Sequence, residues 1–305
     1  MDIIGKKYLY FAISLIIIVP GLISLILFGL NLSIDFVGGS RLTLLFPNNV
    51  SEKTVKTVRE TLDVRKIKAT TLEKSTNRIF LRTEPLDQKQ NAEFIKDLEK
   101  EVKDVKQESF ETIGPTIGRE TTENAVKAVV FASILIVLYI TWSFRKVPKP
   151  ASGFRFGVCA IIALIHDVLI VVGTFSVLGH FFGVEVDSLF FTAVLTIIGF
   201  SVHDTIVVFD RIRENLRRLP GVSFEKIVNE SILQTLGRSL NTSLTVILVL
   251  FSLLLFGGES IRWFVVALLI GIISGTYSSI LNASPLLVIW EEWNRKRLAS
   301  NKDAN

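Results

Sequence analysis

Six long apolar stretches constrain the fold of this 305-residue chain more than any other feature. A helix of about 20 apolar residues is long enough to cross a hydrocarbon core of about 30 Å. The stretches raise the hydrophobic fraction to 49% and the mean hydropathy to +0.48. They predict a polytopic α-helical membrane protein with six transmembrane helices in the lipid bilayer. The predicted spans are residues 8–30, 125–144, 156–178, 189–209, 238–256 and 263–290.

The basic residues predict how these spans are oriented. A net charge of +5 would also suit a nucleic-acid partner, but the basic residues gather in short segments beside the apolar stretches, for example 6–7, 145–155 and 211–218. Such segments stay on the cytoplasmic side of a membrane. We therefore expect no nucleic-acid partner, and a multi-pass protein of the cell (inner) membrane with both termini cytoplasmic. The first span is too long for a cleaved signal peptide, so we interpret it as an anchor.

Residues 31–123 differ from the rest of the chain because they mix charges of both signs with short apolar patterns. Strand and helix periodicities alternate in the order β-α-β-β-α-β, which is typical of a ferredoxin-like domain. We predict a small α+β extracytoplasmic domain between the first and second helices. The predicted organisation is therefore residues 1–30 (N-terminus and first helix), 31–123 (ferredoxin-like domain), 124–290 (helices two to six) and 291–305 (cytoplasmic tail). The six elements of the domain are predicted at residues 41–46, 51–62, 66–72, 78–82, 88–102 and 105–113.

An acidic residue inside the fourth span is the main candidate for function. Asp204 precedes Arg211 by seven residues, which places it roughly 10 Å inside the cytoplasmic boundary. A carboxylate at such depth costs about 2.5–3.5 kcal/mol on insertion scales and usually serves an ion or proton path. Ser201 and Thr205 share its helix face, and His203 stands beside it. The alternative is a structural hydrogen bond between helices.

Two further polar groups lie within the spans. Arg238, Asn241 and Thr242 form a stripe near the cytoplasmic start of the fifth span. The side chain of Arg238 either extends inward toward Asp204 or extends to the lipid headgroups. Asp167 follows His166 on the third span, and this pair either carries protons or is a satisfied structural contact.

Several kinds of chemistry lack their usual sequence signals. The single cysteine, Cys159, can form no disulfide within one chain, and the three histidines are far apart. We therefore expect no metal site, and no cofactor or catalytic grouping of an enzyme is apparent. Gly38–Gly39 lacks the context of a phosphate loop and is interpreted as a tight turn. Gly271 and Gly275 predict a close helix contact.

Five motifs resemble the SecF family, which belongs to the resistance–nodulation–division superfamily. The resemblance covers nearly the whole chain, with the outer domain matched mainly in pattern. The motifs are SIDFVGGS at Ser33–Ser40, IGPTIGRE at Ile113–Glu120, SVHDTIVVFDRIRENLRR at Ser201–Arg218, LGRSLNTS at Leu236–Ser243 and YSSILNASPLL at Tyr277–Leu287.

This resemblance implies a subunit of the Sec protein-export auxiliary complex that uses the proton gradient to promote late translocation and release of preproteins. The implied partners are a SecD-like six-helix protein, the SecYEG-like translocon channel and the translocating preprotein. The family's fourth-span Asp and fifth-span Arg, which transfer protons, correspond to Asp204 and Arg238. Possible supporting residues are Ser201, His203, Thr205, Asn241, Thr242 and Asp167.

Two expectations follow about partners, and one alternative stays open. The face bearing Ser201, Asp204, Thr205 and Val208 is expected to meet the SecD-like partner, because a six-span half would otherwise expose it to lipid. The outer domain is expected to fold without a ligand and to contact either the preprotein or the partner's outer domain. The alternative function is half of a proton-coupled small-molecule exporter of the same superfamily.

Overall fold

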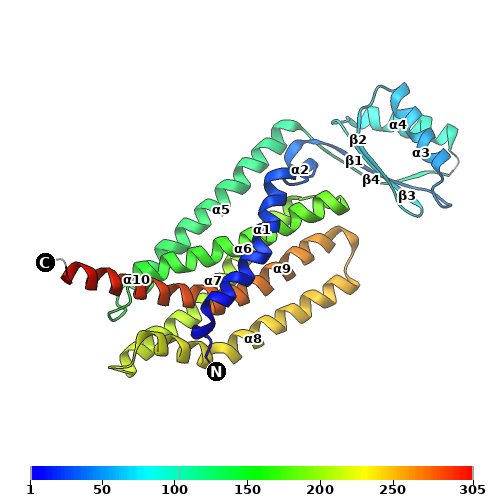
Figure 1. Ribbon diagram of the computed structural model, residues 1–305. Helices are drawn as coiled ribbons and strands as arrows, with labels where there is room; N and C mark the ends of the chain where they lie inside the picture. Colours follow the sequence, from blue (N-terminus) through cyan, green and yellow to red (C-terminus); the bar gives the residue numbers. More distant parts are fainter. Residues whose placement is uncertain (1, 103, 304–305) are drawn as a thin grey trace. The chain divides into compact units, whose positions relative to one another are not determined.

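The computed structural model describes residues 2–102 and 104–303 (Figure 1). Met1, Lys103 and the last two residues of the predicted tail, Ala304 and Asn305, lie outside the described residues. The chain divides into two compact units. One comprises Leu32–Val126, and the other comprises Met1–Asn31 together with Lys127–Asn305.

The Leu32–Val126 unit contains a four-stranded antiparallel sheet with strand order β2-β3-β1-β4. Its elements follow the predicted β-α-β-β-α-β order, preceded by one short helical turn, so the ferredoxin-like prediction is confirmed. The elements are α2 (Ile34–Val37), β1 (Gly39–Leu45), α3 (Glu52–Val64), β2 (Ala69–Lys74), β3 (Arg78–Thr83), α4 (Gln88–Glu101) and β4 (Lys106–Ile113).

One face of this sheet packs against α3 and α4. Leu42, Leu44 and Leu81 of the central strands pack with Phe94 and Leu98 of α4, all at most 1% exposed. Both helix starts are capped: the hydroxyl of Ser51 accepts a hydrogen bond from the backbone N–H of Thr54 at α3, and Asp87 and Gln90 form a capping box at α4. The capping residues explain where each helix begins. The apolar face of each helix explains how it packs on the sheet.

Gly38 and Gly39 permit a turn that other residues would resist. Gly38 has φ +76° and Gly39 has φ +127°, in the region that favours glycine. A Cβ added at Gly38 would lie 2.9 Å from the Cα of Pro115, and one added at Gly39 would lie 2.8 Å from the carbonyl oxygen of Thr83. The glycine pair therefore allows close backbone contact at the start of β1.

The second unit contains the membrane helices. Within the described residues, six helical stretches are long and apolar enough to cross a membrane, as predicted. Short 3₁₀ turns, η1 (Ile4–Lys6) and η2 (Glu259–Ile261), precede the first and sixth. The sixth stretch combines three segments and contains a π-helical turn, η3. The helices are α1 (Lys7–Phe28), α5 (Pro115–Ser143), α6 (Gly153–Phe182), α7 (Ser188–Arg218), α8 (Phe224–Phe256), and α9 (Arg262–Ser278) followed by η3 (Ser279–Ala283) and α10 (Ser284–Asp303).

Several helices extend beyond the predicted spans. Helix α5 starts at Pro115 rather than at residue 125, because proline suits the first turn of a helix. Residues 224–235 and the predicted fifth span form one continuous helix, α8. No proline interrupts it, and the single Gly237 is tolerated.

Glycines set the closest helix approaches in this unit. A Cβ added at Gly275 of α9 would lie 3.0 Å from the Cβ of Ser201 on α7, and one at Gly271 would collide with the side chain of Ile197. The predicted small-residue surface of the sixth span therefore packs on α7. Gly21 of α1 and Gly173 of α6 meet in the same way, backbone against backbone. These two approaches bring four helices around one polar interior.

Candidate functional site: the buried polar residues of the membrane helices

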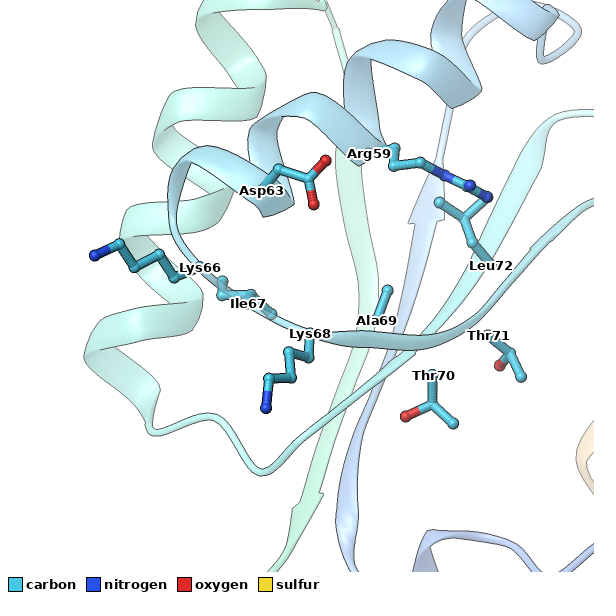
Figure 2. A pocket seen from close by; sticks show the side chains of 9 residues that line it. All are labelled: Arg59, Asp63, Lys66, Ile67, Lys68, Ala69, Thr70, Thr71 and Leu72. Carbon is cyan, nitrogen blue, oxygen red and sulfur yellow. The ribbon is translucent and has the colours of Figure 1, made fainter.

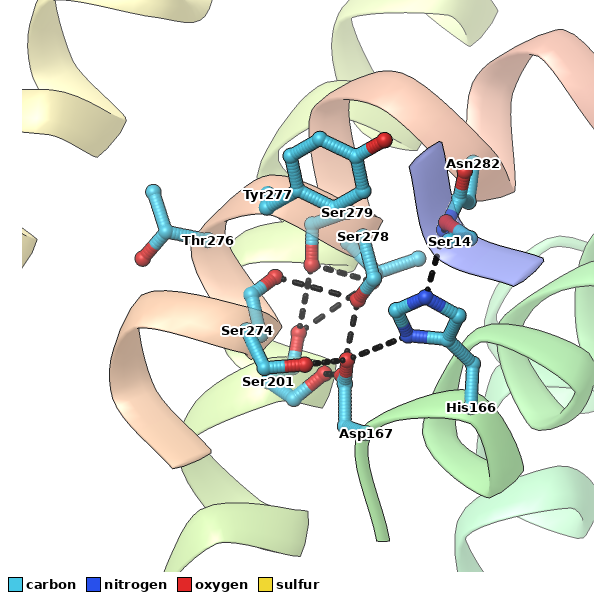
Figure 3. A network of polar contacts seen from close by, with 12 residues as sticks. Ser14, His166, Asp167, Ser201, Ser274, Thr276, Tyr277, Ser278, Ser279 and Asn282 are labelled. Atoms are coloured by element: carbon cyan, nitrogen blue, oxygen red, sulfur yellow. Dashed lines mark hydrogen bonds and ion pairs between the residues drawn. The ribbon is translucent and has the colours of Figure 1, made fainter. Parts of the chain in front are cut away.

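Asp167, halfway along α6, is the centre of a buried polar cluster (Figure 3). Its side chain is 1% exposed. The hydroxyls of Ser201 and Ser278 donate to Oδ2 at 2.6 and 2.7 Å, and Ser274 donates to Oδ1 at 2.8 Å. The Nδ1 atom of His166 lies 3.0 Å from Oδ1. Both carboxylate oxygens are thus fully occupied by neighbours from α6, α7 and the sixth span.

His166 extends the cluster to the first helix. Its Nε2 atom lies 2.9 Å from the hydroxyl of Ser14 on α1, and that hydroxyl also accepts from Nδ2 of Asn282 at 2.9 Å. The ring of His166 stacks on Tyr277, with centroids 6.2 Å apart. A continuous hydrogen-bonded chain therefore joins α1, α6, α7 and the sixth span.

The π-helical turn η3 adds Ser279 and Asn282 to the polar interior, whereas Ser274 and Ser278 come from the preceding helix α9. Pro285 has no backbone N–H, so the carbonyl of Leu281 loses the donor that a regular helix would supply. Interruptions of this kind widen a helix locally, and π-turns are frequent at functional sites. The hydroxyl of Ser279 consequently lies 2.8 Å from that of Thr205 and donates to the carbonyl of Ser201 at 3.0 Å.

Asp204 lies on the same helix as Ser201 but has a much poorer environment. The residue is 2% exposed. Its one hydrogen bond within the described residues comes from the hydroxyl of Ser243 on α8, at 3.4 Å. Ser243 in turn lies 2.5 Å from the hydroxyl of Thr276 on α9. Ser239, also buried, has a hydroxyl without a partner in the described part of the chain. Asp204 is thus a buried carboxyl group that its surroundings satisfy only weakly.

The structure brings some predicted residues together and separates others. Ser201, Asp204, Thr205 and Asp167 all lie in the protein interior, at 1–2% exposure. The remaining predicted residues have exposed positions: His203, Arg238, Asn241 and Thr242. No ion pair of Arg238 with Asp204 occurs among residues 2–102 and 104–303.

One expectation about these residues is wrong. The face bearing Ser201, Asp204, Thr205 and Val208 does not meet a partner, because it is buried against other helices of the same chain. The glycines of α9 allow that helix to cover α7 directly. The exposed polar surface lies instead on α8, at Arg238, Asn241 and Thr242.

Sequence reasoning missed most of the hydroxyl groups in the site. Serine and threonine are common in membrane helices, where they often bond to their own backbone, so a single one is uninformative. A spacing of four residues gives the available signal, because Ser274 and Ser278 on α9, like Ser239 and Ser243 on α8, share one helix face. The missed residues are Ser14, Ser239, Ser243, Ser274, Thr276, Ser278, Ser279 and Asn282.

The chemistry of the site is that of proton exchange or of polar helix packing. Hydroxyl groups donate and accept, and a carboxyl group can gain or lose a proton. In the described ranges 2–102 and 104–303, no group of three or more His, Cys, Asp or Glu side chains is placed to hold a metal ion.

Six helices that are long and apolar enough to span a membrane, with a ferredoxin-like unit after the first, define a multi-pass membrane protein. Residues 94–293 match the family described as "Protein export membrane protein SecD/SecF, C-terminal", and residues 23–46 match the "SecD/SecF GG Motif", which includes Gly38–Gly39. The chain belongs to this SecD/SecF family of protein-export membrane proteins.

Named relatives agree with this assignment. The chain is 47% identical over 301 residues to protein translocase subunit SecF of Thermobaculum terrenum, covering 95% of this chain and 94% of that one. It is 46% identical to SecF of Anaerolinea thermophila, with 96% of each chain covered. The crystal structure of SecDF, a translocon-associated membrane protein from Thermus thermophilus, superposes with a TM-score of 0.82 at 36% identity. That match covers 96% of this chain but spans only 39% of the SecDF chain.

Proposed function

We propose that this chain is the SecF-type subunit of a Sec auxiliary complex and couples the proton gradient to late translocation and release of preproteins. The observation that carries the coupling is the environment of Asp204: a carboxyl group 2% exposed, with a single hydrogen bond at 3.4 Å. A permanently ionised carboxylate would need more donors at such a site. A group that alternates between charged and neutral forms requires only modest stabilisation of each.

The size of the driving force suits this role. Moving one charge through a potential of 100 mV releases about 2.3 kcal/mol, comparable with a typical coupling free energy of 1–3 kcal/mol. Ser243 and Thr276 connect Asp204 to α8 and α9. Protonation of Asp204 would therefore change contacts among three helices, which is how a local charge is converted into helix movement.

The exposed polar stripe on α8 supports a SecD-like partner. Arg238, Asn241 and Thr242 are exposed on a membrane helix, and lipid offers such side chains no hydrogen-bond partners. A second six-helix bundle with a carboxyl group at matching depth would satisfy Arg238. The relatives named SecDF support the pairing, because the SecDF chain of Thermus thermophilus is much longer than the segment matched here.

The proposal also includes two further partners and a location in the cell. The SecYEG-like channel and the emerging preprotein are the further partners. The protein resides in the cell inner membrane with both termini cytoplasmic, as the basic segments favour, and the Leu32–Val126 unit lies on the outer side.

The function is tested with membrane vesicles that translocate a preprotein, with and without an imposed proton gradient. We expect the chain, together with its partner, to add an increment of preprotein release that disappears when the gradient is collapsed. Vesicles lacking the chain provide the control. An increment of the same size without a gradient would contradict proton coupling, and export of small molecules alone would favour the exporter alternative.

Cysteine crosslinking tests the partner surface. In a chain whose Cys159 is replaced by Ala, Thr242→Cys is expected to crosslink to the SecD-like partner, because Thr242 is exposed and its hydroxyl bonds only to its own helix within the described residues. Ser201→Cys, at 2% exposure, is the matched control and should give no crosslink. Crosslinks of Thr242→Cys solely between copies of this chain would refute the assignment.

A further inference from the structure

Strand β2 forms an open edge of the sheet in the Leu32–Val126 unit. It pairs only with β3 among the described residues, and five of its six residues are exposed. Exposed edges are normally protected by charged residues or proline. In β2 the charged residues, Glu73 and Lys74, stand at its end and the run Ala69–Leu72 has neither, whereas in β4, at the other edge, Lys106, Glu108 and Glu111 are spread along the strand. The Ala69–Leu72 part of the β2 edge is therefore protected by neither charge nor proline.

The hairpin geometry shows which backbone groups are open. Ser75 N–H donates to the carbonyl of Arg78 at 2.8 Å, which makes these two residues a hydrogen-bonded pair. Bonded and non-bonded pairs alternate along antiparallel strands. The N–H and C=O of Leu72 and Lys74 therefore point away from β3 and are available to another strand.

A basic hollow adjoins this edge, between the end of α3 and the start of β2 (Figure 2). Its volume is about 740 Å³. Arg59, Lys66 and Lys68 contribute three cations, against the single carboxylate of Asp63. Lys68 pairs with Glu84 at 3.3 Å, whereas Arg59 and Lys66 form no ion pair among the described residues. The hollow therefore favours acidic side chains beside the strand edge.

We propose that the β2 edge binds an extended polypeptide by strand addition, with acidic side chains of that polypeptide in the adjacent hollow. Main-chain pairing provides affinity without demanding a particular sequence, which suits a ligand that passes through as an unfolded chain. The inference rests on the proposed function in one respect: the translocating preprotein is the extended polypeptide. It assigns to the outer domain a specific surface and a mode of contact.

The test uses the full chain in lipid nanodiscs and a dye-labelled probe, α-lactalbumin that has been reduced and blocked with iodoacetamide so that it stays unfolded. Lys74→Pro removes an outward N–H but no bond to β3, and proline is tolerated on edge strands. Lys74→Ala removes the same ion pair with Glu52 and keeps the N–H. Proline is expected to weaken binding about fivefold relative to alanine, the loss of roughly one hydrogen bond. Disulfide-intact α-lactalbumin should bind neither variant.

A second measurement is independent of the proline variant's folding. A photo-reactive benzoylphenylalanine in place of Thr70, on the edge, should crosslink to the unfolded probe, whereas one in place of Lys56, on the outer side of α3, should not. Equal binding of the Lys74→Pro and Lys74→Ala chains, or Thr70 crosslinks only to the outer domain of a partner, would overturn the proposal. Binding is measured without a gradient or export, so a negative result here leaves proton coupling untouched, and a failure of coupling leaves this result unchanged.

Discussion

Asp204→Asn is expected to abolish the gradient-dependent increment of preprotein release while leaving assembly with the partner intact. Asparagine preserves the shape of the side chain and can still accept the hydrogen bond from Ser243. It cannot exchange a proton at physiological pH. Because the native contact is a single bond of 3.4 Å, little stability is at stake, and the loss should be confined to coupling.

The measurement is preprotein release in vesicles with and without an imposed proton gradient, at matched protein levels. Asp210→Asn is the control, since Asp210 lies on the same helix but is exposed and paired with Arg213. It should retain the full increment, because an exposed ion pair contributes at most about 1 kcal/mol. Retention of the increment by Asp204→Asn would show that protons do not pass through this group.

The sequence predicts which residues share the polar face of the fourth span, but not which helices cover that face. Residues spaced by three and four share a helix face, so Ser201, Asp204 and Thr205 necessarily point the same way. What covers that face depends on helix rotation and packing. The contact of Gly275 with Ser201 places α9 there, and a pair of glycines identifies a close contact without identifying its partner.

The fifth span is a second case in which the sequence does not predict how a helix is packed. Two polar faces run along α8, one with Arg238, Asn241 and Thr242 and one with Ser239 and Ser243. The first is more polar, and the sequence left open whether Arg238 extends toward Asp204 or to the lipid headgroups. Packing favours the second face in the interior, because small hydroxyls fit between closely packed helices, while the long Arg238 side chain remains exposed. Polarity alone therefore does not predict which of the two faces of α8 lies in the protein interior.

The outer domain was more predictable because its pattern is local. Alternation in β1, the cap at Ser51 and the apolar spacing of Phe94 and Leu98 each act within a few residues. The π-turn of the sixth span had no such signal: Pro285 marks an interruption, but several backbone geometries relieve it. The polar groups that this turn contributes, Ser279 and Asn282, were accordingly missed.

The Asp167 cluster predicts a different kind of defect from Asp204. Asp167→Asn replaces one acceptor oxygen with an amino group, so two of the four polar contacts lose their acceptor. Hydrogen bonds between membrane helices contribute about 0.6–1.7 kcal/mol each. We expect a loss of about 1–3 kcal/mol, and thus a melting temperature lower by about 5 °C in detergent. Export per assembled molecule should be reduced less than by Asp204→Asn.

Thermal unfolding of the purified chain is measured together with export. The two measurements distinguish a structural role of Asp167 from a role in proton transfer. Ser278→Ala should lower the melting temperature by a smaller amount, because it removes one donor from Asp167. Ser252→Ala, whose hydroxyl bonds to its own helix and is exposed, should leave it unchanged. If Asp167→Asn instead left stability intact and abolished the gradient-dependent increment, the proton path would run through α6. The saturated contacts of Asp167, against the sparse ones of Asp204, favour the structural role: a carboxylate held by three hydroxyls and a histidine must break several bonds to change its charge.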